Sequence, residues 1–263
     1  MTSPQQLAVV TGASRGIGRV IAERLADRGQ HVIALARSVE ALTAEPTNPN
    51  ITPLAVDVSD PFAVSRVWHI IEVEHGVPTL LVNNAAIGGV SGPTWTQEPS
   101  DWWRLFEINV RGTFLPTHHA LPAMIARGSG RIVNFSSGAA YFPVATDNDA
   151  QISAAYMSSK AAVQRFTEAL AGELVGTGVT VFAMSPGMVK TDMTAPLFAE
   201  DWEDPDIWSP PELSADLIEF IDSGAIDALS GRFIHVAQDD WRTFAESAND
   251  IVAADKQTLR LVR

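Results

Sequence analysis

The sequence contains no cysteine, which excludes disulfide bonds, thiolate nucleophiles and cysteine-ligated metal sites. Positive charge is also scarce: 18 lysines and arginines stand against 31 aspartates and glutamates, a formal net charge of -13 at pH 7. Such a chain lacks the basic surface by which proteins bind nucleic acids or anionic membranes. No apolar run approaches the ~18 residues of a membrane-spanning helix, and the segment Met1–Gln6 lacks the basic and apolar regions of a signal peptide. We therefore expect a soluble, cytoplasmic protein that binds neither nucleic acid nor membranes.

Apolar residues, in contrast, are plentiful: 46% of the 263 residues are hydrophobic and 19% are charged, so the chain can bury a large core. No repeat or linker divides the sequence, and we expect a single domain over residues 1–263. Short apolar runs rich in β-forming residues alternate with longer segments of helical period. The runs are Leu7–Thr11, His31–Ala36, Ile51–Val56, Thr79–Val82, Arg131–Phe135, Val179–Met184 and Arg232–Val236. Most are apolar on both faces, which predicts a doubly wound, mostly parallel seven-stranded α/β sheet with helices on both faces.

A glycine-rich turn follows the first of these runs and leads directly into a helical segment. Its sequence is Thr11-Gly12-Ala13-Ser14-Arg15-Gly16-Ile17-Gly18. Glycines allow a tight turn and the close approach of a pyrophosphate, whose charge is favoured at a helix N-terminus. The alternative is a turn without a ligand, but the strand before it and the helix after it favour a ligand. A dinucleotide fits better than ATP, because the turn lacks the Lys-Ser/Thr pair of a P-loop.

The second run ends in Ala36-Arg37-Ser38 and lacks the acidic residue that binds the adenosine ribose in many dinucleotide-binding folds. A guanidinium at this place attracts a 2′-phosphate through charge-assisted hydrogen bonds, whereas a carboxylate would repel it. Arg15 could converge on the same phosphate. Either arginine could instead be a solvated surface charge, and Arg37 could stack on the adenine ring. Their common location on the adenosine side favours NADP(H) over NAD(H).

Tyr156 and Lys160 have the spacing that places two side chains on one face of a helix. A tyrosine is a poor acid–base group near neutral pH, because its ordinary pKa is about 10. A nearby ammonium stabilises the phenolate and lowers that pKa toward a useful range. Taken alone, such a pair is more often part of an ordinary amphipathic helix, so its interpretation depends on the other motifs.

Together these motifs resemble those of the short-chain dehydrogenase/reductase family, in its compact single-domain branch. The matching residues are the glycine-rich turn, Asn83-Asn84-Ala85, Asn109, Ser137, Tyr156-x-x-x-Lys160 and Pro186-Gly187, in the order typical of the family. The resemblance extends from Leu7 to Val236. It implies a Rossmann-like fold and an NADP(H)-dependent oxidoreductase acting on a carbonyl or alcohol group of a small organic molecule.

The resemblance also implies a catalytic tetrad. Tyr156 would be the general acid that protonates a carbonyl oxygen, and Lys160 would lower its pKa and hold the nicotinamide ribose. Ser137 would hydrogen-bond the substrate oxygen, with Ser136 as the nearby alternative. Asn109 would hold a water molecule that links Lys160 to solvent.

A larger set of residues is implied to bind the cofactor. It consists of Gly12, Ser14, Arg15, Gly16, Ile17, Gly18, Arg37, Ser38, Asp57, Val58, Asn83, Ala85, Tyr156, Lys160, Pro186, Gly187, Val189 and Thr191. The six histidines are scattered or poorly spaced for a shared ion, so we expect no metal site. Because the family usually forms dimers or tetramers, the resemblance implies a homo-oligomer.

Three features depart from the family pattern. Ala86 stands where the family usually has glycine, and the extra residues 143–152 lengthen the interval between Ser137 and Tyr156, which indicates an inserted loop beside the active site. Pro116 predicts a kink or an end in the helix after Asn109.

Residues 193–210 fit neither a strand nor a helix, because prolines and acidic residues surround Leu197, Phe198, Trp202 and Trp208. We expect a mobile lid whose apolar side chains close over a hydrophobic or aromatic substrate; a surface loop without that role is the alternative. Two other functions remain open for the whole chain. One is an inactive NADP-binding sensor or scaffold, and the other is an epimerase or dehydratase of the same fold.

Overall fold

The computed structural model describes residues 6–43, 48–89, 92–142, 153–200 and 202–260. Its strands form one sheet, in the order β3-β2-β1-β4-β5-β6-β7, and every neighbouring pair is parallel. The strands are β1 (Leu7–Thr11), β2 (His31–Ala36), β3 (Ile51–Ala55), β4 (Leu80–Asn83), β5 (Gly130–Phe135), β6 (Val179–Ser185) and β7 (Phe233–His235). The predicted seven-stranded, doubly wound sheet is confirmed.

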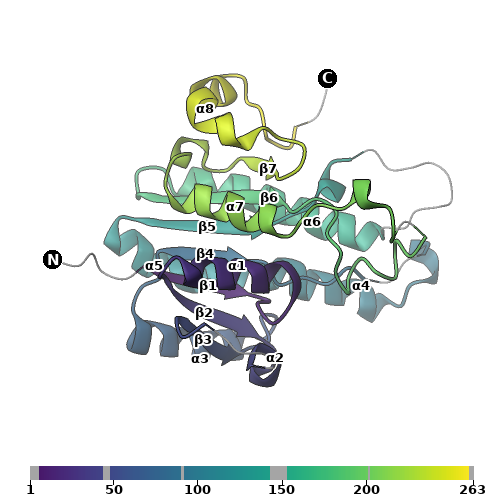
Figure 1. The fold of residues 1–263 in the computed structure, drawn as a ribbon, viewed down its shortest axis with the longest axis horizontal. Helices are drawn as coiled ribbons and strands as arrows, with labels where there is room; N and C mark the ends of the chain where they lie inside the picture. Colours follow the sequence, from purple (N-terminus) through teal and green to yellow (C-terminus); the bar gives the residue numbers. More distant parts are fainter. Residues whose placement is uncertain (1–5, 44–47, 90–91, 143–152, 201, 261–263) are drawn as a thin grey trace.

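Helices cover both faces of this sheet (Figure 1). One hydrophobic cluster joins a face of the sheet to α1 (Gly16–Asp27), α7 (Glu212–Asp222) and α8 (Phe244–Ala253). A second cluster joins the other face to α3 (Pro61–Ile70), α5 (Gly112–Arg127) and α6 (Ala154–Glu173). The remaining α-helices of the described residues, α2 (Val39–Thr43) and α4 (Pro99–Phe106), are short.

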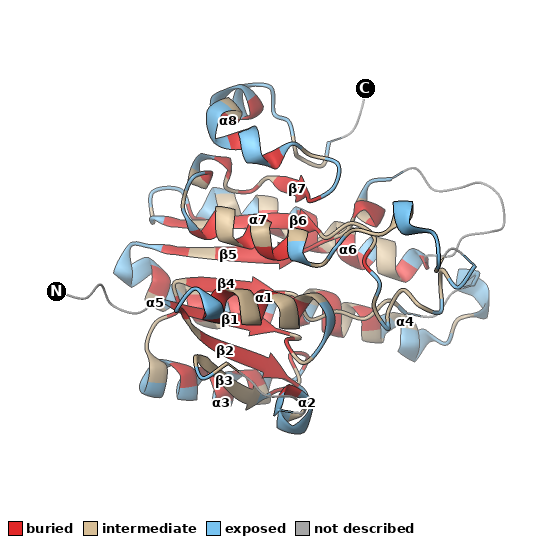
Figure 2. Cartoon of the chain, in the orientation of Figure 1, coloured by how far each residue is buried: buried red, intermediate tan, exposed pale blue. Residues whose placement is uncertain are grey.

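The two-sided burial of the strands explains why the sequence predicts them so clearly. In β1, Ala8 and Val10 belong to the first cluster, whereas Leu7 and Val9 belong to the second. Successive side chains of a strand point to opposite faces, so a strand between two helical layers must be apolar throughout. Figure 2 shows these central strands as almost continuously buried.

The helical segment after α4 is irregular, but not where we expected. Residues Glu107–Arg111 form a π-helical turn, and α5 then continues through both Pro116 and Pro122. The prediction that the helix ends at Pro116 is therefore wrong, whereas the alternative kink stays a prediction. A proline lacks the N–H that would donate to the carbonyl oxygen four residues earlier, so Pro116 removes one hydrogen bond while α5 continues on both sides of it.

Two further expectations concern an inserted loop and membrane-spanning helices. The insertion expected at residues 143–152 lies outside the described residues. Among the helices that the structure does describe, none combines the length and the apolar character needed to span a bilayer.

The strand order indicates where on the sheet a ligand would bind. β1 lies between β2 and β4, so the chain leaves β1 in one direction and later returns to its other side. In open α/β sheets, ligands bind in the crevice at the carboxyl ends of the strands beside such a switch point.

Candidate active site

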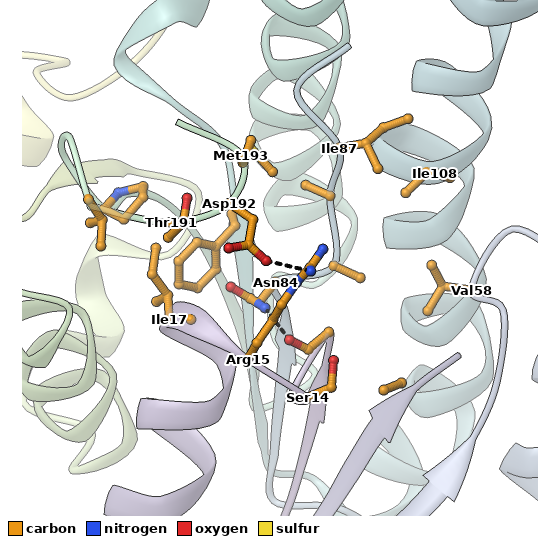
Figure 3. Close-up of a pocket in the computed structure, with 18 of the residues that line it drawn as sticks. Ser14, Arg15, Ile17, Val58, Asn84, Ile87, Ile108, Thr191, Asp192 and Met193 are labelled. Atoms are coloured by element: carbon orange, nitrogen blue, oxygen red, sulfur yellow. Dashed lines mark hydrogen bonds and ion pairs between the residues drawn. The ribbon is translucent and has the colours of Figure 1, made fainter. Parts of the chain in front are cut away.

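A cavity of about 440 Å³ opens at the carboxyl ends of the strands (Figure 3). Its walls come from the segments that follow β1, β2, β3, β4, β5 and β6, together with residues of α6. The topology therefore brings more than six separate stretches of the chain to one place, at the switch point described above.

The glycine-rich turn forms the floor of this cavity. Gly12 and Gly16 adopt positive φ angles of 68° and 56°, a conformation that favours glycine. Asn84 holds the turn in place, because its Nδ2 donates to the carbonyl oxygens of Thr11 (2.9 Å) and Gly12 (3.2 Å). A Cβ atom on Gly18 would collide with the same Asn84 amide.

This turn fits the phosphates of a dinucleotide. A Cβ atom on Gly12 would lie 2.9 Å from the backbone of Ala85, so only glycine allows the turn to pack so tightly. Arg15 occupies the N-cap position of α1 without a capping hydrogen bond from its side chain, and the first turn of α1 contains no acidic residue. The N–H groups at the start of α1 are thus available to an anion.

Three charged side chains line the part of the cavity that follows β1, β2 and β3. Arg37 follows β2, is exposed, and forms no ion pair with any residue that the structure describes. Arg15 forms an ion pair with Asp192, with 2.6 Å between Nη1 and Oδ2. Asp57 follows β3 and accepts hydrogen bonds from Ser59, and its pKa lies below the ordinary value because these bonds and Arg104 outweigh partial burial.

Tyr156 and Lys160 extend from the first turns of α6 into the cavity. The helix begins there because the Oγ of Ser153 accepts a hydrogen bond from the backbone N–H of Tyr156 (3.2 Å). The Nζ of Lys160 donates to the carbonyl oxygen of Phe135 (2.8 Å) and lies 5.7 Å from the centre of the Tyr156 ring. The predicted helical spacing thus brings the two side chains together.

The electrostatics of this pair differ from our expectation. Burial raises the pKa of Tyr156, and a hydrogen bond with Ser137 opposes that rise only in part. Burial also lowers the pKa of Lys160 to about 7, from an ordinary value of 10.5. We expected the ammonium to lower the pKa of Tyr156, but in this structure desolvation dominates for both groups.

The two candidate serines have different surroundings. Ser136 is buried, and its hydroxyl donates to the carbonyl oxygen of Lys160 (3.0 Å). Ser137 is half-buried, and its hydroxyl interacts with Tyr156 while accepting a hydrogen bond from the N–H of Ala139 (3.2 Å). Both line the cavity, but only Ser137 lies beside the tyrosine hydroxyl, and this arrangement favours Ser137 over Ser136.

Asn109 does not line the cavity but forms hydrogen bonds with residues beside it. Its Oδ1 accepts from the N–H of Ile87 (2.9 Å), and its Nδ2 donates to the carbonyl oxygen of Ile87 (3.1 Å) and to the Oγ of Ser159 (3.0 Å). It is only 1% exposed and lies in the π-helical turn rather than on the cavity wall. The expected water-holding role stays a prediction. The structure shows that Asn109 holds the backbone of Ile87, which does line the cavity.

Most of the predicted site residues come together at this cavity. The residues on its wall are Gly12, Ser14, Arg15, Gly16, Ile17, Arg37, Asp57, Val58, Ala85, Ser137, Tyr156, Lys160, Pro186, Gly187, Val189 and Thr191. The four predicted residues off the wall are Gly18, Ser38, Asn83 and Asn109.

Asn83 and Ser38 have other surroundings than those we expected. Asn83 is 2% exposed, and its Nδ2 donates to Thr117 and Asn134 within the layer between the sheet and α5. Its neighbour Asn84 faces the cavity instead. The Oγ of Ser38 accepts a hydrogen bond from the N–H of Ala41 at the start of α2 (3.2 Å).

Sequence reasoning did not predict several residues that line the cavity. They are Leu35, Ala36, Val56, Asn84, Ala86, Ile87, Ile108, Phe135, Lys190 and Asp192, whereas Met193 and Thr194 belong to the predicted lid segment 193–210. Lys190 and Asp192 could have been found, because they flank the predicted Thr191 in sequence. Ile87 and Ile108 carry no sequence signal for a site, since apolar residues in such segments are usually core.

The segment 193–210 has its two ends attached near the cavity. Met193 and Thr194 line the cavity, and the N–H of Ser209 donates to the carbonyl oxygen of Met188 (2.5 Å). Between these ends, Trp202 and Trp208 pack edge to face with their ring centres 5.1 Å apart. The Nζ of Lys190 lies 5.2 Å and 5.6 Å from the two ring centres.

Comparison with known proteins adds family relationships to this geometry. The family model for short chain dehydrogenases matches residues 6–202. A short chain dehydrogenase of Pseudocercospora fijiensis is 41% identical over 199 residues, which cover 72% of this chain and 61% of that protein. The NADPH-dependent pterin aldehyde reductase of Arabidopsis thaliana is 34% identical over 208 residues, covering 76% of this chain and 83% of the relative. The crystal structure of a metagenomic short-chain oxidoreductase in complex with NADP is 31% identical and covers 83% of this chain and 90% of its own, with a TM-score of 0.67.

Proposed function

Because the chain belongs to the short chain dehydrogenase family, we propose that it is an oxidoreductase that uses NADP(H) to interconvert a carbonyl group and an alcohol on a small, apolar organic substrate. The observation that carries this proposal is the convergence of the glycine-rich turn with Tyr156, Ser137 and Lys160 on one cavity. Such a cavity combines a place for a dinucleotide with a proton donor for a reacting oxygen. The homodimer or homotetramer and the cytoplasmic location that we expected stay predictions.

Two groups of described residues would hold two parts of the cofactor. The turn and the open start of α1 would hold the pyrophosphate, and Lys160, Pro186 and Val189 would surround the nicotinamide end. When bound, NADPH supplies the hydride. Two relatives support this choice of cofactor: one is named an NADPH-dependent reductase, and the other was solved in complex with NADP.

The proton chemistry follows from the surroundings of Tyr156. Because burial raises its pKa, the hydroxyl is protonated at neutral pH, which is the form that carbonyl reduction requires. Ser137 interacts with that hydroxyl and would donate a second hydrogen bond to the substrate oxygen. Tyr156 would then transfer its proton from Oη to that oxygen, and Lys160 would stabilise the resulting phenolate.

Replacing the proton donor tests this function. Tyr156→Phe should lower kcat for ketone reduction by roughly 10²–10⁴, the usual contribution of a general acid–base group, while NADPH still binds. Tyr141→Phe is a matched control, because Tyr141 is the only other tyrosine and does not line the cavity. The assay is NADPH absorbance with a panel of ketones, quinones and sugars, and cofactor binding is followed by fluorescence.

The outcomes separate the remaining functions. Full activity of Tyr156→Phe would mean that another group donates the proton. Binding of NADPH without turnover of any substrate would indicate a sensor or scaffold, and product formation without net NADPH consumption would indicate an epimerase or dehydratase.

Cofactor preference depends on Arg37 in this proposal. A charge-assisted hydrogen bond to a phosphate contributes about 1.5–3 kcal/mol, which is roughly 10- to 150-fold in affinity. Replacing Ala36 with Asp and Arg37 with Ser should therefore weaken NADPH binding and strengthen NADH binding. Equal weakening of both cofactors would show that Arg37 stacks on the adenine, and a wild-type kcat/KM for NADH at or above that for NADPH would overturn the preference.

We further propose that residues 1–263 form one catalytic domain in which the segment 193–210 is a substrate lid. Its two ends, at Met193 and Ser209, lie near the cavity, and Lys190 of the cavity wall contacts the rings of Trp202 and Trp208 between them. Phe198, Trp202 and Trp208 are all partly exposed, so they have apolar surface with which to cover a substrate.

A further inference from the structure

The ion pair between Arg15 and Asp192 joins two distant parts of the cavity wall. Arg15 rises from the glycine-rich turn, and Asp192 belongs to the segment that follows β6 (Figure 3). In the sheet, β6 is separated from β1 by β4 and β5. The segment around Asp192 thus crosses the strand ends to reach the turn, and Thr191 also lies against Gly16.

Arg15 and Arg37 belong to neighbouring segments of the cavity wall. The N–H of Ala13 donates to the carbonyl oxygen of Leu35 (3.1 Å), so the turn runs directly beside the end of β2. Arg15 and Arg37 each follow that bonded pair by two residues, and both line the cavity. The two arginines therefore extend from neighbouring segments of the cavity wall, within which a single phosphate group could contact both.

Their partners differ, however. Among the described residues Arg37 has no ion-pair partner, whereas one nitrogen of Arg15 is held 2.6 Å from a carboxylate oxygen. A guanidinium that is already paired with a carboxylate has less to gain from a phosphate. The carboxylate also brings negative charge close to the place where a phosphate would bind.

Resting on the proposed use of NADP(H), we propose that Asp192 is a specificity-determining residue: its carboxylate competes with the 2′-phosphate of the cofactor for Arg15 and so weakens the preference for NADPH over NADH. NADH lacks this phosphate, so its binding does not require Arg15 to leave Asp192. The competition is modest in size, because both side chains are about 70% exposed and such pairs are weak.

The test is a double-mutant cycle on cofactor affinity, measured by fluorescence titration with NADPH and with NADH. Asp192→Asn should strengthen NADPH binding by about 2- to 5-fold, the size expected for an exposed ion pair, and should leave NADH binding unchanged. In an Arg15→Gln background the same substitution should have no effect on either cofactor. High salt should reduce the gain, since exposed charges are screened.

Asp206→Asn is the matched control, because it removes the same charge from an exposed residue that does not line the cavity. A gain for NADPH with Asp206→Asn of similar size would overturn the proposal in favour of a general charge effect. A loss of NADPH affinity in Asp192→Asn would also overturn it, since Asp192 would then position Arg15 for the phosphate. An equal change for both cofactors would likewise overturn it, because the ion pair would then affect a part of the molecule that NADPH and NADH share.

The proposed function can fail separately from this inference. A wild-type protein that binds neither NADPH nor NADH would contradict the function itself. A protein that binds NADPH normally but does not respond to Asp192→Asn would contradict only the role of Asp192.

Discussion

Cofactor binding should be coupled to proton uptake by Lys160. This side chain is 3% exposed, and burial lowers its pKa to about 7. At pH 8 a group with this pKa is about 9% protonated. If the anionic cofactor restores the ordinary pKa of 10.5, Lys160 will be almost fully charged in the complex. Binding at pH 8 should then take up about 0.9 protons per site.

The uptake should depend on pH in a characteristic way. At pH 6 the lysine is already about 90% charged before binding, so uptake from this group should fall to about 0.1 protons. The phosphate of the cofactor does not obscure the result at pH 8, because phosphate monoesters lose their second proton near a pH of about 6. Isothermal titration calorimetry of NADPH in two buffers with different ionisation enthalpies measures the number of protons directly.

The chain offers a simple set of controls, because it contains only three lysines, Lys160, Lys190 and Lys256. Lys160→Met should abolish the uptake at pH 8, whereas Lys256→Met should retain it, since Lys256 is exposed and does not line the cavity. An uptake near zero in the wild type at pH 8, or an unchanged uptake in Lys160→Met, would refute the reasoning.

The remaining predictions concern the lid and the glycine-rich turn. Replacing both Trp202 and Trp208 with alanine should raise KM for an apolar ketone by roughly 10-fold, the effect of losing partly buried aromatic surface; Phe62→Ala is the control, and unchanged kinetics would contradict a lid. Gly18→Ala should lower the free energy of unfolding by about 1–3 kcal/mol through overpacking, because its Cβ would lie 2.5 Å from the Gly12 carbonyl oxygen. Gly172→Ala, in an exposed part of α6 with no atom near its Cβ, should raise that free energy by up to about 1 kcal/mol; chemical denaturation distinguishes the two glycines.

Local patterns in the sequence were enough to predict the sheet and the centre of the site. The strands are apolar on both faces because each lies between two helical layers, and this burial is visible in residues such as Val9 and Val10 without any knowledge of the fold. The glycine-rich turn and the Tyr156–Lys160 pair are equally local. Each depends on the backbone conformation or helical spacing of adjacent residues, which the chain itself carries.

Tertiary packing decided into which surroundings the side chains of two adjacent residues point. Asn83 and Asn84 are adjacent and chemically identical, yet Asn83 faces the layer between the sheet and α5 while Asn84 holds the glycine-rich turn. A shift of one residue at the end of β4 would exchange these roles. Sequence reasoning placed Asn83 in the site because it had no means of fixing that register.

Tertiary structure alone also decided the electrostatics. The pKa values of Tyr156 and Lys160 depend on how many surrounding atoms exclude water, and these atoms come from separate segments such as the end of β5. Arg15 meets a carboxylate 177 residues away in the sequence, so no local pattern could reveal that contact. The sequence therefore determines which chemical groups are present and how each strand or helix forms, whereas the packed fold determines which groups share a low-dielectric cavity and what charge they carry there.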